Sequence, residues 1–237
     1  GGYVTAIRAA QLGFKTAIIE KESLGGVCLN WGCIPTKALL KSAQVFEYLQ
    51  HAEDYGLKVK GADKDFDAVV KRSRGVAEGM SKGVQFLMKK NKIEVIKGYG
   101  TLKAGKKVSV KAEDGSTTEY SASNIIIATG ARSRELPSLP QDGKKIIGYR
   151  EAMTLDKQPK KMIVVGSGAI GIEFAYFYNS MGTEVTVVEY LPNIVPVEDE
   201  DVSKQLERSF KKSGVKIMTS AEVTSVDTSG DGVKATV

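Results

Sequence analysis

The two cysteines are the residues of this chain best suited to chemistry. Cys28 and Cys33 are separated by four residues in the glycine-rich segment 25–37. Two thiols that meet can form a disulfide, which takes up two electrons and two protons from a dithiol. An apolar helical pattern begins after Lys37, and Pro35 suits a first helical turn. We therefore expect Cys33 at a helix N-terminus, where the helix dipole stabilises a thiolate.

Three interpretations of this pair compete. Buried, inert cysteines are common in intracellular proteins. Zinc is disfavoured because the chain offers only two thiols, and its single histidine, His51, lies well down the following helix on what we expect to be a surface. A redox-active pair explains the surrounding glycines and the helix start. Spacing alone favours that third interpretation only slightly.

A second region has the features of a dinucleotide-binding motif. A short apolar strand, residues 162–165, runs into Gly166, Gly168 and Gly171, and the next strand ends at Glu189. Gly166 permits the tight turn, Gly168 lets backbone approach a pyrophosphate, and Gly171 allows close helix packing. Glu189 would accept hydrogen bonds from a ribose and would repel a 2′-phosphate, so the motif favours NAD over NADP.

The start of the chain repeats this pattern. The matching residues are Gly2, Ala6, Gly13 and Glu20 against Gly171, Ala175, Gly182 and Glu189. In this alignment Gly2 is the third glycine of a motif whose opening strand would precede residue 1, and Glu20 is the ribose acid. Two such sites suggest two cofactors, one of them a candidate flavin.

These motifs predict an α/β fold with two Rossmann-like dinucleotide-binding domains, the first interrupted by a small antiparallel β-meander. We expect helices over residues 65–91 and 199–213, the latter followed by a strand over 216–218. Strands 93–97, 108–111 and 117–120 should form the meander, with a turn at Asp114-Gly115. Residues 136–140 are expected to be an extended linker, and 233–237 the beginning of a strand.

Composition excludes several classes of protein. The net charge of +6 is spread along the chain, which gives little support to nucleic-acid binding. No apolar run approaches the roughly 18 residues of a membrane span, since the best candidates, 125–128 and 162–165, have strand length. Two cysteines cannot form the framework of a secreted disulfide scaffold. We therefore expect a cytoplasmic protein without a resident metal.

The cysteine segment, continuing into Ala38-Leu39-Leu40, closely resembles the redox-active segment of dihydrolipoamide dehydrogenases, within the flavin-dependent pyridine nucleotide-disulfide oxidoreductases. The resemblance spans the whole chain and implies the cofactors FAD and NAD. It implies an FAD-binding domain over 1–145 and an NAD-binding domain over 146–237. The implied cofactor contacts are Gly1, Gly2, Glu20, Lys21, Gly26, Val27, Lys37, Gly100, Ala128, Thr129 and Gly130 on the FAD side, and Gly166, Gly168, Ala169, Ile170, Gly171, Glu189 and Val223 on the NAD side.

The resemblance also implies roles for four catalytic residues. Cys28 would exchange with the substrate dithiol, and Cys33 would face the flavin. Lys37 would approach the flavin, and Glu173 would pair with that lysine; from its sequence alone, Glu173 could equally be a solvated helix residue. Val223 likewise has two possible roles, as a contact to the adenine or as an ordinary strand valine. Trp31 stands where many members have a small aliphatic residue.

The implied protein is a homodimer that oxidises dihydrolipoamide, with electrons passing through the cysteine pair and flavin to NAD. Its partners would be the lipoyl domains of 2-oxo acid dehydrogenase complexes or the glycine cleavage carrier protein. The alternatives are another disulfide reductase, similar to glutathione or mercuric reductases, and a non-catalytic nucleotide-binding module. We expect the 237 residues to be a fragment without the first strand and the C-terminal dimerisation domain, and to be inactive alone.

Overall fold

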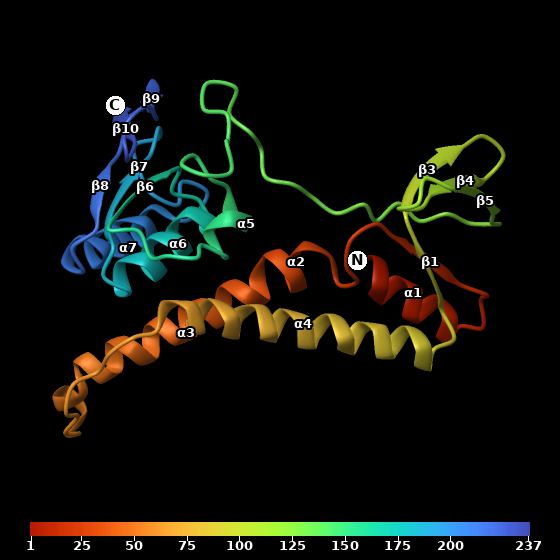
Figure 1. Ribbon diagram of the computed structural model, residues 1–237, viewed down its shortest axis with the longest axis horizontal. Coiled ribbons are helices and arrows are strands. Elements are labelled where there is room, and N and C mark those ends of the chain that lie inside the picture. The colour runs from red at the N-terminus through yellow and green to blue at the C-terminus, as the bar shows by residue number, and fades with distance from the viewer. The chain divides into compact units, whose positions relative to one another are not determined.

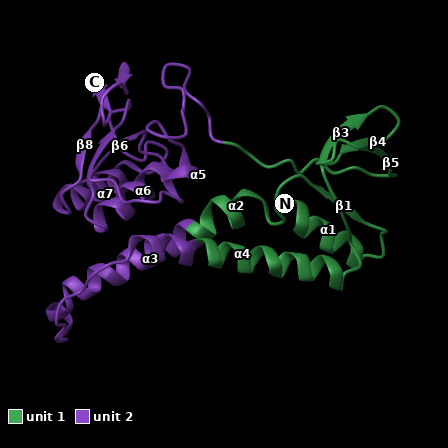
Figure 2. Cartoon of the chain, viewed as in Figure 1, with its two compact units in different colours: residues 1–35, 74–132 green, residues 36–73, 133–237 purple.

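The structure is a computed structural model that describes residues 1–237, and its chain divides into two compact units (Figures 1 and 2). Unit 1 comprises Gly1–Pro35 and Arg74–Arg132, and unit 2 comprises Thr36–Ser73 and Ser133–Val237. Two helices, α3 (Cys33–Gln50) and α4 (Phe66–Lys90), contribute to both units. The part of α3 beyond Pro35 is grouped with the second nucleotide-binding motif in unit 2. The division into nucleotide-binding domains at residue 145 stays a prediction. None of the helices has both the length and the apolar character to cross a membrane.

Unit 1 is built around a parallel pair of strands. Its elements besides the shared helices are α1 (Gly2–Gln11), β1 (Ala17–Glu20), α2 (Gly26–Trp31), β2 (Glu94–Lys97), β3 (Tyr99–Lys103), β4 (Lys107–Lys111) and β5 (Thr117–Ser121). Strand β1 pairs with β2, and α1 packs on them through Ala6. The buried cluster also takes in Leu24 and Leu29 beside the cysteine segment and Val84 and Met88 from α4. The cysteine segment is therefore anchored in the core of this unit.

The antiparallel meander is present, but its first strand differs from the expected one. It consists of β3, β4 and β5, whereas residues 94–97 form β2 and pair in parallel with β1. Gly98 makes this change of sheet possible: its φ is +145°, and a Cβ there would lie 2.6 Å from the carbonyl oxygen of Lys111. Alternation alone does not tell which neighbour a strand will pair with, so the prediction was wrong for that strand.

Unit 2 contains the second nucleotide-binding motif on a parallel three-stranded sheet. Its elements are η1 (Ala52–Tyr55), α5 (Tyr149–Ala152), β6 (Lys161–Val165), α6 (Ala169–Ser180), β7 (Glu184–Val188), α7 (Glu200–Lys212), β8 (Lys216–Met218), β9 (Ser225–Asp227) and β10 (Lys234–Thr236). The sheet order is β6-β7-β8, and α6 connects the first two strands. Val185 and Val187 of β7 and Ala175 and Tyr178 of α6 are fully buried, so helix and sheet share one core. The predicted α/β class is confirmed.

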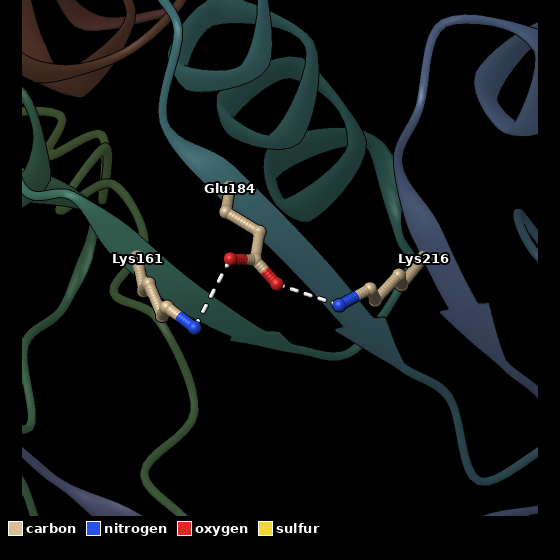
Figure 3. A network of polar contacts seen from close by, with 3 residues as sticks. All are labelled: Lys161, Glu184 and Lys216. Atoms are coloured by element: carbon tan, nitrogen blue, oxygen red, sulfur yellow. Dashed lines mark hydrogen bonds and ion pairs between the residues drawn. The ribbon is translucent and has the colours of Figure 1, made fainter.

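At their amino ends the three strands of this sheet are joined by a charge cluster (Figure 3). Glu184 of β7 lies between Lys161 of β6, at 3.1 Å, and Lys216 of β8, at 2.6 Å. Hydrogen bonds from Lys216 and then Lys161 lower the pKa of the Glu184 carboxyl. The side chains of the cluster are solvated, so the cluster adds little to stability. The glycine motif and Glu189 lie at the opposite, carboxyl ends of the strands.

Two segments expected to be extended have other structures. Residues 136–140 contain a tight turn, in which the Leu139 amide donates to the Leu136 carbonyl at 2.9 Å. Pro137 then occupies the second turn position, where its fixed φ is favoured. Residues 125–128 are not assigned to a strand, because they form no ladder with a neighbour. The linker predicted to be extended over residues 136–140 therefore contains a turn, and residues 125–128, which have the length of a strand, belong to none.

Candidate functional site

The two cysteines form an exposed thiol pair in unit 1. Cys28 lies in the short helix α2, and Cys33 is the first residue of α3, as the Pro35 signal predicted. Both are free thiols. The pKa of Cys28 is raised, first by its hydrogen bond with the Cys33 thiol and then by partial burial. Two exposed thiols that influence each other's titration suit the reduced form of a reversible disulfide.

Polar contacts in the core position the helix that carries Cys28. The Asn30 side-chain amide donates to the carbonyls of Leu24 at 3.0 Å and Gly26 at 2.9 Å, and the Ser81 hydroxyl of α4 donates to the same Leu24 carbonyl at 3.0 Å. Gly25, with φ of +105°, lets the chain turn into α2. The two contacts to Leu24 satisfy a buried carbonyl that would otherwise be costly. Sequence reasoning missed Asn30 and Ser81, and it predicted no helix over residues 26–31.

Trp31 closes the same helix. Its indole Nε1 donates to a Glu22 carboxylate oxygen at 2.8 Å, and the Arg74 guanidinium lies over its ring, 4.1 Å from the centroid. A cation over an indole face is attracted by the ring quadrupole. Trp31 therefore links the cysteine segment to α4. Arg74 lies far from it in sequence, so no local pattern could have indicated this contact.

Some of the residues expected on the FAD side lie close together in unit 1. A Cβ at Gly2 would lie 3.4 Å from the Ala128 Cβ, and one at Gly100 would lie 3.3 Å from Ile19. Glu20 ends β1 and accepts the Glu22 amide at 2.8 Å. These contacts bring the start of α1, the end of β1 and segments 98–100 and 128–130 together. Gly1, Lys21, Gly26, Gly100, Ala128, Thr129 and Gly130 are exposed, and Val27 is partly so.

Lys37 and Glu173, both in unit 2, form an ion pair. The Lys37 side chain is 62% exposed and that of Glu173 29% exposed, so water screens the attraction substantially. The contact between these two side chains is the one the resemblance implied. Their roles in catalysis stay predictions.

The second glycine motif has the geometry needed to hold a pyrophosphate. Gly166 has a φ of +95°, and a Cβ at Gly171 would overlap the Gly166 carbonyl oxygen, so both glycines are required by the backbone. Gly168 caps α6 without a side-chain hydrogen bond, and a Cβ there would meet nothing within 4 Å. Ala169 and Ile170 are also exposed. The amides at the α6 N-terminus thus face open space, which fits the diphosphate of a dinucleotide.

Glu189 follows β7 at the carboxyl edge of the sheet, and only 7% of it is exposed. Its Oε2 accepts the Ser167 amide at 2.8 Å and the Ser167 hydroxyl at 2.6 Å, and its Oε1 accepts the Leu191 amide at 2.8 Å. Burial alone would raise the pKa of this carboxyl, but the donors from Leu191 and Ser167 outweigh burial and lower it. Glu189 is therefore an anion at neutral pH.

Val223 is buried just after β8, in a segment that is not assigned to a strand. Nearby, the Ala221 amide donates to the Glu189 carbonyl at 3.0 Å. Both alternatives for Val223, an adenine contact and an ordinary strand valine, stay predictions.

His51 is exposed, and its ring nitrogen lies 3.0 Å from the Glu47 carbonyl. This confirms the surface position expected for the histidine.

The family described as "Pyridine nucleotide-disulphide oxidoreductase" matches residues 1–237. Among curated proteins, the dihydrolipoyl dehydrogenase of Zymomonas mobilis is 48% identical over 237 residues, covering 100% of this chain and 51% of that protein. The dihydrolipoyl dehydrogenase of Rhizobium etli is 50% identical over 252 residues, covering 100% of this chain and 52% of that protein. The chain spans about half the length of these curated relatives.

Solved structures agree with this assignment. LpdA from Mycobacterium tuberculosis superposes with a TM-score of 0.90 at 30% identity, covering 99% of this chain and 52% of LpdA. The HOCl-induced flavoprotein disulfide reductase RclA from Escherichia coli, as its Cu(II) complex, gives a TM-score of 0.84 at 26% identity and covers 100% of this chain and 50% of RclA.

Proposed function

The chain belongs to the pyridine nucleotide-disulphide oxidoreductase family, and from that premise we propose that the whole protein is a dihydrolipoyl dehydrogenase. It oxidises dihydrolipoamide to lipoamide, uses FAD as its bound cofactor and passes electrons to NAD. The observation that carries the proposal is the exposed pair of free thiols, with Cys28 in α2 and Cys33 at the start of α3.

In the proposed reaction the pair begins as a disulfide. One substrate thiolate attacks the Cys28 sulfur, the Cys28–Cys33 bond breaks, and the electron pair remains on Cys33. The second substrate thiolate then attacks the substrate sulfur joined to Cys28, which releases lipoamide and a reduced Cys28. Two electrons and two protons leave the substrate, and the cysteine pair gains them. Cys28 takes the exchange role and Cys33 the flavin-facing role.

The residues of unit 1 fit a bound FAD. The start of α1, Gly100 and residues 128–130 would hold its phosphates and adenosine, and Glu20 its ribose. When bound, a flavin would supply the two-electron step between the dithiol and the nicotinamide. Lys37 offers a cation that favours negative charge on a reduced ring, and Glu173 holds that cation in place.

The residues of unit 2 fit NAD. The open α6 N-terminus beginning at Gly168 would hold the diphosphate, and Glu189 would accept a ribose hydroxyl. Because Glu189 is anionic, a 2′-phosphate placed on that ribose would be repelled. This argues against an NADPH-dependent reductase.

We extend the proposal to partners and location. A homodimer that receives its substrate from lipoyl domains of 2-oxo acid dehydrogenase complexes, or from the glycine cleavage carrier protein, fits a dihydrolipoyl dehydrogenase. A cytoplasmic location suits free, reactive thiols, because cytosolic reductants keep such thiols available.

The test is dihydrolipoamide-dependent reduction of NAD by the flavin-loaded holoenzyme, produced with its complete natural chain. Cys28→Ser and Cys33→Ser should each lose turnover while retaining flavin, whereas His51→Gln, at an exposed position, should leave the rate unchanged. Wild-type rates in both cysteine variants would show that the pair is structural. Turnover of another disulfide with NADPH, and none with dihydrolipoamide, would favour a different reductase of the family.

A further inference from the structure

The hydroxyl of Ser167 lies at the centre of the second nucleotide-binding motif, yet the glycine pattern assigns it no role. Ser167 stands between Gly166 and Gly168 and is fully buried. Its hydroxyl and its amide both reach the same oxygen of Glu189, at 2.6 and 2.8 Å. A backbone amide at this position is available from any residue, but the second donor requires a hydroxyl side chain.

The direction of the hydroxyl bond is fixed by its other neighbour. The Val195 amide lies 3.2 Å from the Ser167 Oγ and 3.1 Å from the Ser167 carbonyl oxygen. An amide can only donate, so the hydroxyl accepts from Val195 and directs its own proton to Glu189. Val195 has a φ of +41°, which is unfavourable for a β-branched residue and shows that this loop is held in place by its contacts.

The contacts leave the Glu189 carboxylate a restricted capacity for a ligand. A carboxylate has about four acceptor positions. Ser167 occupies two positions on Oε2 and Leu191 one on Oε1, and the Tyr190 backbone also donates to this carboxylate. These donors hold the carboxylate in one orientation. A rotated carboxylate would lack this arrangement, and a protonated carboxyl could in addition donate a hydrogen bond to a phosphate.

We propose that Ser167 is a positioning residue for cofactor specificity: its hydroxyl holds Glu189 as an anion in the orientation that meets the ribose. The proposal rests on the proposed NAD site. It adds that discrimination between the two nicotinamide cofactors depends on a serine between two glycines as well as on the acid. Ser167 itself touches neither the ribose nor the reacting atoms.

The test compares two ligands that lack a nicotinamide, ADP-ribose and its 2′-phosphate, by calorimetry with the flavin-loaded holoenzyme. Ser167→Ala should reduce the preference for ADP-ribose about tenfold, as expected for loss of a charge-assisted hydrogen bond. The KM for NAD should rise with kcat unchanged. As the pH is lowered, the affinity of Ser167→Ala for ADP-ribose should begin to fall at a higher pH than the affinity of the wild type.

Two further variants separate specificity from packing. Ser167→Gly lacks the hydroxyl without leaving a methyl group in the site, and it should give the same loss. Ser180→Ala is the matched control, because Ser180 is another buried serine of this unit whose hydroxyl donates to a carboxylate, that of Glu47. It should leave the preference and the pH profile unchanged. Melting temperatures identify any variant that fails to fold.

An unchanged preference in both Ser167 variants, or an equal weakening for the two ligands with the same pH profile, would overturn the proposal. Glu189→Gln distinguishes this failure from a failure of the NAD site. If Glu189→Gln abolishes the preference and the Ser167 variants do not, only the role of Ser167 is wrong. If Glu189→Gln changes nothing, the ribose contact itself is wrong.

Discussion

Substituting Gly171 by alanine should destabilise the fold, whereas the same change at Gly168 should impair only ligand binding. A Cβ at Gly171 would overlap the Gly166 carbonyl oxygen and lie 3.2 Å from both its carbonyl carbon and the Val164 Cγ1. The obstacle is backbone and cannot rotate away. A Cβ at Gly168 would enter open space, and the Gly168 backbone, with φ of −64° and ψ of 175°, is acceptable to alanine.

The magnitude follows from two opposing effects. Overpacking against backbone costs about 3 kcal/mol, at the upper end of its usual range. Alanine in place of glycine inside α6 returns about 1 kcal/mol through helix propensity. The net loss for Gly171→Ala is about 2 kcal/mol, equivalent to a fall of roughly 4–8 °C in Tm for a protein of this size. Gly168→Ala at the N-cap should cost under about 1 kcal/mol.

The assay measures thermal unfolding and ADP-ribose affinity on both variants of the holoenzyme. We expect Gly171→Ala to show the lower Tm, and Gly168→Ala to show weaker binding at a nearly unchanged Tm because its methyl group occupies the approach to the α6 N-terminus. Equal Tm values for the two variants would refute the claim that α6 packs on β6 through Gly171. Undiminished binding by Gly168→Ala would refute the claim that the pyrophosphate approaches that glycine.

Two further predictions use the titrating groups. Cys33→Ala removes the main cause of the raised Cys28 pKa. Iodoacetamide should therefore alkylate Cys28 faster at pH 8 in the flavin-free variant than in the reduced wild type. Identical pH profiles of alkylation in the two proteins would contradict the interaction between the thiols. Glu189→Gln should lower stability at neutral pH by about 1–3 kcal/mol, since the Ser167 donors lose an anionic acceptor. The folded pKa of Glu189 lies below the ordinary glutamate value of 4.5. The carboxylate's contribution to stability is therefore complete above that value and is lost as pH falls through the folded pKa. The wild type and Glu189→Gln should thus reach the same stability in acid. Glu184→Gln, on the same strand but at its solvated end, should show no comparable loss.

The elements predicted well were those whose signals are local. Glycines at 166, 168 and 171 lie between a short apolar run and a helical pattern, and the structure begins α6 at Ala169 as expected. A turn, a cap and a close helix contact are each determined within a few residues. For the same reason, the helix that starts at Cys33 was predicted correctly.

The features that sequence could not supply depend on contacts between distant residues. The pairing of β2 with β1 joins strands separated by α2, α3 and α4. The hydrogen bonds of Ser81 to Leu24 and of Ser167 to Glu189 likewise link separate elements. Helix α2 was missed because six residues between glycines are too few for a helical periodicity to show.

The indole held between Glu22 and Arg74 has an optical consequence. Trp31 is the only tryptophan of the chain, so all of its indole fluorescence arises within the cysteine segment. The ring lies in the same short helix as Cys28, one turn further on, and α3 starts two residues later. Emission from this chain therefore reports the immediate surroundings of its thiol pair, without an introduced dye.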